Sequence, residues 1–267
     1  MASNSRPTTL NVNLDDLAKM IDHSLLHPTM TDSDVEAGLR ISKKYGVATA
    51  CVKPYHILFA KKLLEGTSVL VCPVIGFPHG NSTSEVKVFE ARRAVEEGGK
   101  EIDMVVNIGR VLSGKWEYVK NDIAAVNRAV VERGAILKVI FENDYLGEKE
   151  IIKLCEICSD IGVAYVKTST GYGFVKGASG DYNYKGATIP HLELMKKHVT
   201  GNVKIKAAGG VRTLDDLLRV RAIGVSRVGA TATGAILDEA VRRGIGTERI
   251  EVEVPPFPAV DSGSGAY

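Results

Sequence analysis

One pattern occurs twice in this chain, in Ala-Tyr-Val-Lys-Thr-Ser-Thr-Gly (164–171) and in Val-Lys-Ile-Lys-Ala-Ala-Gly-Gly (203–210). Each stretch reads as a short apolar strand that ends in a lysine, Lys167 or Lys206, followed by the small residues of a polar loop. A lysine at the end of a buried strand costs free energy unless it is paired or has lost its proton. Two such lysines indicate amine chemistry rather than a structural role.

Strand-like runs of this kind recur along the whole chain. Most are near-continuous apolar runs, which is typical of strands covered on both faces. Eight are predicted: Met20–Asp22, Val47–Val52, Val69–Ile75, Glu101–Asn107, Ile136–Glu142, Val163–Thr168, Val203–Ala208 and Ser226–Gly229.

Helical patterns fill the gaps between these runs, and several begin with a hydroxyl residue followed three positions later by an acidic one. The pairs are Thr31 and Asp34, Ser82 and Glu85, and Thr213 and Asp216. Eight strands alternating with helices predict an α/β fold, a (β/α)8 TIM barrel forming a single domain over residues 1–267. An open doubly wound sheet is the alternative, weakened because no G-x-G-x-x-G follows the first strand. Residues 1–13 read as a polar segment and 254–267 as a flexible tail.

Composition excludes several functional classes. The chain has 267 residues and a formal net charge of +2, without a dense Lys/Arg run, which argues against a nucleic-acid partner. Its apolar runs fall well short of the ~20 residues of a membrane span, and no signal-like segment begins it, so we expect a cytoplasmic protein. Cys51 and Cys72 read as small core residues, while Cys155 and Cys158 form a C-x-x-C inside a helical pattern, without a second pair at zinc spacing. We therefore expect neither a metal nor a cofactor.

Ionisable residues concentrate where the strands of such a barrel would end, which is where barrel enzymes build their sites. The predicted ends hold Asp22, Cys51, Asp103, Glu142, Lys167 and Lys206, and Lys138 lies inside the fifth strand. One interpretation is that salt bridges fill the barrel, with the three acids facing the three lysines. Because buried ion pairs rarely add stability, a functional site is the stronger interpretation for the whole set.

Two neighbouring lysines affect each other's protonation. A free lysine has a pKa near ~10.4, and both burial and a nearby ammonium favour loss of a proton. A neutral amine attacks carbonyl carbons and forms a Schiff base, whose protonated form draws electrons from an adjacent bond. Asp103 and the second lysine would then move protons. These residues alone do not rank Lys167 above Lys206 as the nucleophile.

Two glycine-containing loops indicate a phosphate site. Gly209 and Gly210 follow the seventh strand, and Gly229-Ala230-Thr231 follows the eighth and leads into a helix. Loops after strands seven and eight, with a helix N-terminus, commonly hold phosphate in these barrels. Gly171 and Arg212 are further candidates. The expected ligand is a small phosphorylated carbonyl compound.

Seven motifs, in order from about residue 20 to 240, together resemble the deoxyribose-phosphate aldolase family. They are Ile-Asp-His-Ser-Leu-Leu (21–26), Gly-Phe-Pro-His-Gly (76–80), Glu-Val-Lys (85–87), Glu-Ile-Asp-Met-Val (101–105), Leu-Lys-Val-Ile (137–140), Val-Lys-Thr-Ser-Thr-Gly (166–171) and Lys-Ala-Ala-Gly-Gly-Val-Arg (206–212).

The resemblance implies a class I aldolase on a (β/α)8 barrel that needs no metal. Such an enzyme reversibly cleaves 2-deoxy-D-ribose 5-phosphate to D-glyceraldehyde 3-phosphate and acetaldehyde, in deoxyribonucleotide catabolism. By motif match, Lys167 is the Schiff-base lysine, Lys206 is the cation that favours its neutral form, and Asp103 moves protons. The implied substrate-binding and phosphate-binding residues are Asp22, Ser24, Cys51, Lys138, Thr170, Gly171, Gly209, Gly210, Arg212, Gly229 and Thr231. Dimers are common among such barrels, so a homodimer is a candidate assembly, although no segment marks an interface.

The chain departs from the common family pattern at three places. Residues 172–185 form a Gly/Tyr-rich insertion, either a lid or a tolerated surface loop. The loop after strand eight reads Gly-Ala-Thr-Ala, with Thr231 keeping a hydroxyl. The third departure is Lys53, which follows Cys51-Val52 where a neutral residue is common. Separately, Tyr267 at the end of the Gly/Ser tail either relays protons in the site or ends a loose tail. A Schiff-base aldolase with a different aldehyde or sugar phosphate, and a non-catalytic sugar-phosphate binder, remain alternatives. Intact Lys167, Lys206 and Asp103 argue against the latter.

Overall fold

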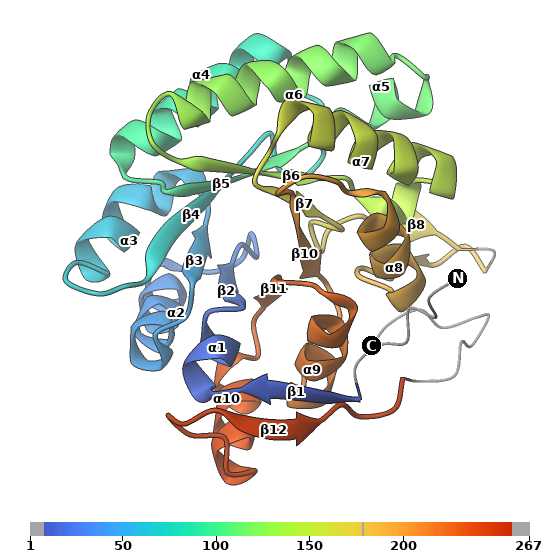
Figure 1. The fold of residues 1–267 in the computed structure, drawn as a ribbon. Helices are drawn as coiled ribbons and strands as arrows, with labels where there is room; N and C mark the ends of the chain where they lie inside the picture. The colour runs from blue at the N-terminus through green and yellow to red at the C-terminus, as the bar shows by residue number, and fades with distance from the viewer. Residues whose placement is uncertain (1–7, 178, 258–267) are drawn as a thin grey trace.

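A computed structural model of the protein describes residues 8–177 and 179–257. Eight parallel strands close into a barrel in the order β10-β11-β2-β3-β4-β5-β6-β7. Helices surround this barrel (Figure 1), so the fold is a (β/α)8 TIM barrel, as the sequence predicts. The open doubly wound sheet is excluded because β7 and β10 pair and close the ring.

The bounds of the barrel strands are β2 (Ile21–Leu25), β3 (Thr49–Val52), β4 (Leu70–Ile75), β5 (Glu101–Val105), β6 (Ile136–Ile140), β7 (Tyr165–Lys167), β10 (Lys204–Ala208) and β11 (Arg227–Ala230). The α-helices are α1 (Leu14–Ala18), α2 (Asp32–Tyr45), α3 (Ile57–Leu63), α4 (Ser84–Glu97), α5 (Ile108–Leu112), α6 (Trp116–Val131), α7 (Glu148–Ile161), α8 (Ile189–His198), α9 (Leu214–Ile223) and α10 (Thr233–Arg242). Two 3-10 turns, η1 (Pro54–His56) and η2 (Asn143–Tyr145), follow β3 and β6.

Local sequence signals explain the helix ends. Thr31 and Thr213 are N-caps whose hydroxyls accept the backbone N–H of Asp34 and Asp216, and both acids bond back to complete capping boxes. The box predicted at Ser82 is wrong by one position, because Thr83 is the N-cap of α4 and its side chain makes no capping bond.

The main core lies between the barrel and its helices, and it holds both cysteines of the C-x-x-C motif on the inner side of α7. Cys155 and Cys158 are fully buried free thiols, as expected of core residues. In the part of the chain that the structure describes, no helix is both long and apolar enough to cross a membrane.

Three features have no counterpart in the predicted pattern. The two ends of the described chain pair as an antiparallel ribbon of β1 (Thr9–Val12) and β12 (Ile250–Glu253), which Figure 1 shows beside α1 and α10. The insertion contains a small hairpin of β8 (Val175–Lys176) and β9 (Tyr182–Asn183). The first barrel strand also runs past its expected end, since β2 continues from Asp22 to Leu25, whereas β6 stops at Ile140, two residues short of the expected end at Glu142.

Candidate active site

The barrel interior contains a layer of charged side chains. They lie on alternate positions of β2, β5, β6, β7, β10 and β11, the positions that face inward in a closed barrel. Lys206 is in register with Lys167 on one side and Arg227 on the other, and Asp103 is in register with Lys138. The cluster consists of Asp22, Glu101, Asp103, Lys138, Lys167, Lys206 and Arg227, all buried.

Asp103 on β5 connects the three lysines. Its Oδ2 atom accepts hydrogen bonds from Lys167 Nζ and Lys206 Nζ, each at 2.8 Å. Its Oδ1 atom accepts from Lys138 Nζ at 2.9 Å and from Cys72 Sγ at 3.2 Å. The structure therefore brings together Lys167, Lys206 and Asp103, which the sequence singled out for chemistry.

A second group of ion pairs lies deeper in the barrel. Arg227 Nη1 contacts Asp22 Oδ1 at 2.6 Å and Glu101 Oε2 at 2.8 Å, and Lys138 Nζ lies 2.8 Å from the same Glu101 oxygen. Asp22 also pairs with Lys206, at 2.5 Å. Neither Glu101 nor Arg227 was predicted as a site residue from the sequence. The signal was available, because Glu101 precedes Asp103 by two residues and therefore faces the same side of the strand.

These contacts shift the pKa values in opposite directions. Burial alone would raise the pKa of Asp103, but Lys138, Lys167 and Lys206 outweigh it and hold the pKa well below its ordinary value. Burial alone would lower the pKa of Lys206, yet Asp103 and Asp22 outweigh it and raise the pKa. The pair therefore consists of a stable carboxylate and a stable ammonium ion.

Lys167 is the lysine of the cluster closest to solvent. It is the last residue of β7, whereas β10 continues two residues beyond Lys206. Both lysines border a pocket of about 930 Å³ at the carboxyl ends of the strands. Of the predicted binding residues, Ser24, Cys51, Thr170 and Gly171 also line this pocket. Asp22 and Lys138 do not line it, and both instead support the charge network from below.

One wall of the pocket has the composition of a phosphate site. It is lined by the predicted residues Gly209, Gly210, Arg212, Gly229 and Thr231. Gly209 and Gly210 have φ values of +81° and +99°, a left-handed backbone that favours glycine. Gly229 lies within β11 rather than after it, so the loop that leads to α10 begins at Thr231.

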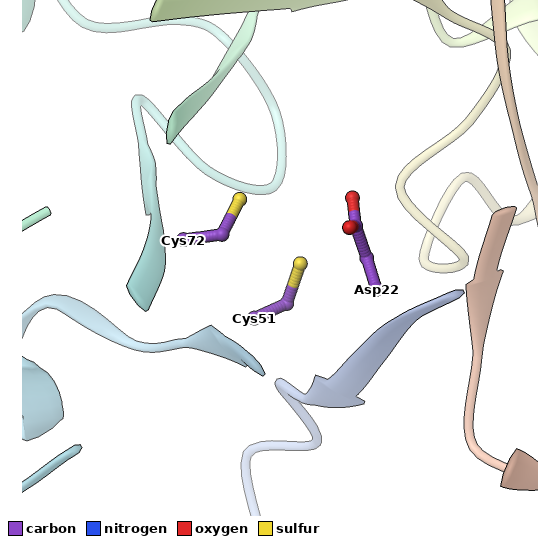
Figure 2. A group of neighbouring side chains, drawn as sticks. All are labelled: Asp22, Cys51 and Cys72. Carbon is purple, nitrogen blue, oxygen red and sulfur yellow. The ribbon is translucent and has the colours of Figure 1, made fainter. Parts of the chain in front are cut away.

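Asp22, Cys51 and Cys72 have the donor types of a metal site. Figure 2 shows their side chains pointing toward one another, and one donor atom from each lies within 4.8 Å of the others. Ammonium groups already contact the same atoms, since Lys138 Nζ lies 3.0 Å from Cys72 Sγ and Lys206 Nζ lies 3.7 Å from Cys51 Sγ. These two buried ammonium groups would repel a metal cation bound at the same donor atoms. Asp22, Cys51 and Cys72 therefore fit the lysine network better than they fit a metal site.

Glu142 does not join the charge cluster, contrary to the expectation from its position. β6 ends at Ile140, and Glu142 has a φ of +60°, which turns its side chain toward the β7–α8 segment. Its carboxylate accepts from Thr170 N at 3.1 Å and from Thr170 Oγ1. Burial raises the pKa of Glu142. Tyr267, the predicted proton relay, lies outside the described residues.

Comparison with known proteins identifies relatives across most of the chain. A family model described as "DeoC/LacD family aldolase" matches residues 17–237. The deoxyribose-phosphate aldolase of Rhodopirellula baltica is 47% identical over 237 residues, covering 89% of this chain and 94% of that protein. The corresponding aldolase of Treponema denticola is 42% identical, covering 83% and 98%.

Solved structures agree with these sequence matches. A putative deoxyribose-phosphate aldolase from Coccidioides immitis superposes with a TM-score of 0.79 at 36% identity, covering 87% of this chain and 88% of that one. The deoxyribose phosphate aldolase of Aeropyrum pernix, described as a tetramer, has a TM-score of 0.75 at 29% identity, covering 85% and 92%.

Proposed function

Because the chain belongs to the DeoC/LacD family of aldolases, we propose that it reversibly cleaves 2-deoxy-D-ribose 5-phosphate to D-glyceraldehyde 3-phosphate and acetaldehyde. The substrate is that of the relatives named deoxyribose-phosphate aldolase. The mechanism rests on the position of Lys167. It is the last residue of β7 and borders the pocket, and its Nζ atom lies 2.8 Å from the Asp103 carboxylate that also binds Lys206.

The charge balance of the cluster supports Lys167 as the nucleophile. Three carboxylates, Asp22, Glu101 and Asp103, face four basic side chains, so the cluster carries no net charge when one amine is neutral. Lys206 contacts both Asp22 and Asp103, which hold its proton. Asp103 is the carboxylate within ion-pair distance of Lys167 in the described chain. Lys167 therefore has the fewest carboxylate partners of the four basic side chains, which supports its role as the nucleophile.

The reaction follows from these positions. The neutral Lys167 amine adds to the substrate aldehyde carbon, and loss of water together with uptake of one proton gives a protonated Schiff base. The C3 hydroxyl then loses its proton, the C2–C3 bond breaks, and its electrons pass to the iminium, releasing D-glyceraldehyde 3-phosphate. Protonation of the resulting enamine at C2 and hydrolysis release acetaldehyde. Asp103 starts as the proton acceptor because its pKa is held low, and Lys206 is the nearby donor.

The phosphate group lies, in this proposal, against the wall formed by Gly209, Gly210, Arg212, Gly229 and Thr231. Backbone N–H groups and the Arg212 guanidinium suit a dianion. Ser24, Thr170 and Gly171 border the remaining pocket and are available to the sugar hydroxyls.

Borohydride reduction in the presence of substrate tests the mechanism. We expect a reduced adduct on Lys167 in peptide mass maps, and no adduct in Lys167→Met. Lys204→Met, two residues before Lys206 with an exposed side chain, is the matched control and should label like the wild type. An adduct on Lys206, or none on either lysine, would refute the assignment.

Turnover with three sugar phosphates tests the substrate. We expect cleavage of 2-deoxyribose 5-phosphate to exceed that of ribose 5-phosphate and of fructose 1,6-bisphosphate. Preference for either alternative would favour a Schiff-base aldolase of different specificity. Deleting Tyr267 tests the proton relay, which is dropped if turnover and proton exchange of acetaldehyde stay unchanged.

The setting of the enzyme is part of the proposal. All four cysteines are buried free thiols, which suits the reducing cytoplasm. A homodimer stays a prediction, and the tetramer described for the Aeropyrum pernix relative makes self-association the assembly to test by light scattering.

A further inference from the structure

The insertion 172–185 borders the pocket instead of projecting freely from it. Tyr172, Phe174 and Tyr184 all line the pocket that contains Lys167. The far end of the insertion approaches the phosphate wall, because a Cβ at Gly209 would lie 3.1 Å from Gly186 Cα and 3.4 Å from the Tyr184 ring. Phe174 and Tyr184 meet edge to face, with ring centroids 5.7 Å apart. The segment therefore forms an aromatic wall of the pocket.

The loop after β6 fixes both ends of this segment. At the C-terminal end, the Asp144 carboxylate accepts from Lys185 N at 3.1 Å and from Gly186 N at 3.0 Å. Near the N-terminal end, Tyr145 Oη donates to the Phe174 carbonyl at 3.1 Å. Contacts at two ends oppose the interpretation of a tolerated surface loop, because such a loop needs no specific partners.

A chain of hydrogen bonds sets the direction of Tyr172. Glu142, held at positive φ, accepts from Thr170, and Thr170 Oγ1 in turn accepts from Tyr172 N at 2.9 Å. Gly173 completes the turn, since a Cβ there would lie 2.7 Å from Glu142 Cδ. The strained backbone at Glu142 and the close approach at Gly173 therefore both fix the direction of the Tyr172 side chain.

The Tyr172 ring reaches the far side of the barrel mouth. It packs on a small apolar cluster formed by Leu26, Cys51, Cys72 and Val74, and meets Phe77 edge-on at 5.7 Å. Cys51 lies on β3, which is opposite β7 in the closed ring of eight strands. Tyr172 therefore covers the space between Lys167 and the strands opposite it.

This covered space faces the aldehyde end of the substrate. The proposed phosphate wall lies at the carboxyl ends of β10 and β11, on one side of Lys167. A substrate bonded to Lys167 with its phosphate on that wall places its two-carbon aldehyde unit toward Leu26, Cys51 and Tyr172. In the synthetic direction, this unit is the donor: it loses water on forming the imine, loses a proton to form the enamine, and bonds to the acceptor carbonyl carbon, whose oxygen takes a proton.

We propose that Tyr172 is a specificity-determining residue that closes the donor side of the pocket and restricts the donor to two carbons. The proposal rests on the proposed Schiff base at Lys167. A propanal enamine carries one more methyl group on its reacting carbon, and that group meets the Tyr172 ring. A single methyl group in a tight apolar pocket changes kcat/KM by about 10–200-fold.

Condensation of D-glyceraldehyde 3-phosphate with acetaldehyde or propanal tests the proposal. We expect Tyr172→Ala to raise the ratio of kcat/KM for propanal over acetaldehyde by about tenfold or more. Tyr172→Phe keeps the ring and should leave the ratio as in the wild type. Tyr182→Ala is the matched control, because Tyr182 lies in the same insertion, is 65% exposed and does not line the pocket.

Borohydride trapping keeps the test decisive if Tyr172→Ala turns over poorly. Intact mass after reduction with equal concentrations of both aldehydes gives the propanal-to-acetaldehyde ratio of adducts without a complete cycle, and it should rise in Tyr172→Ala. An unchanged ratio in both assays, or an equal rise in Tyr172→Phe, overturns the role of the ring. Absence of any wild-type adduct would instead refute the Schiff base itself, so the two failures are distinguishable.

Discussion

A buried ion pair outside the active site holds β5 in place. Lys87 on α4 donates to Asp122 Oδ2 on α6 at 2.7 Å and to the Val105 carbonyl at the end of β5 at 3.0 Å. Ser84 Oγ donates to the other Asp122 oxygen at 2.7 Å. The two charged side chains are 0% and 1% exposed. Two helices and the strand that carries Asp103 therefore meet at one ammonium group.

We predict that Lys87→Met strongly destabilises the protein. Methionine keeps most of the side-chain volume, but it leaves the Asp122 carboxylate buried without its cation and the Val105 carbonyl without its donor. Breaking a buried pair in this way costs about 3–5 kcal/mol. At about 2–4 °C per kcal/mol for a chain of this size, the Tm should fall by about 6–20 °C.

Urea unfolding and calorimetry at pH 7 measure this effect, and two further variants define it. Lys87→Met with Asp122→Leu should recover most of the lost stability, because an apolar pair of similar volume often matches a buried ion pair. Arg40→Met, which breaks the exposed Arg40–Glu36 pair, should leave the unfolding midpoint nearly unchanged. The reasoning is refuted if Lys87→Met behaves like Arg40→Met, or if the double variant is no more stable than the single one.

Three further predictions concern the site. Lys206→Leu should lower kcat and move the acid limb of the kcat/KM pH profile upward, because Lys167 would lose its neighbouring cation while Asp103 keeps Lys167 and Lys138 as partners; an unchanged profile contradicts the coupling. Burial raises the pKa of Glu142 above its value in the unfolded chain, so between these two pKa values the folded state binds a proton that the unfolded chain has lost. The free energy of unfolding therefore falls as the pH rises through this range. Glu142→Gln should flatten the pH dependence of Tm above pH ~4, and a parallel curve argues against it. Incubation with EDTA should leave turnover unchanged, since the proposed steps use no metal, and a loss that added Zn²⁺ or Mg²⁺ restores would contradict them.

The sequence predicts the features of this fold that depend on neighbouring residues. Apolar runs and capping pairs are local, so the eight barrel strands could be located, and two of the three predicted capping boxes are present, at Thr31 and Thr213. The β1–β12 ribbon was missed although both segments alternate polar and apolar residues, because its two strands lie about 240 positions apart in the chain and their pairing is not a local property.

Side-chain direction explains what was predicted and missed in the site. Side chains alternate in direction along a strand, which correctly predicts that Asp103 and Lys138 face the barrel interior. The same alternation along the predicted strand Ile136–Glu142 would place Glu142 in the interior too. The strand instead ends at Ile140, and the left-handed backbone at Glu142 breaks the alternation. Arg227 was missed for a different reason: its partner Glu101 lies on β5, several strands away in the ring, so the pair exists only once the barrel closes.

Lys167 and Lys206 differ in how far their strands extend past them and in how many carboxylates contact each ammonium group. Lys167 and Lys206 are in register on adjacent strands and share one oxygen of Asp103. β10 extends past Lys206, which also binds Asp22, so removal of its proton would leave two buried carboxylates short of a partner. β7 ends at Lys167, and loss of that proton leaves Asp103 still bound by Lys138 and Lys206. Of the two lysines that border the pocket, Lys167 therefore has the fewer carboxylate partners, which supports its proposed role as the nucleophile and that of Lys206 as the cation.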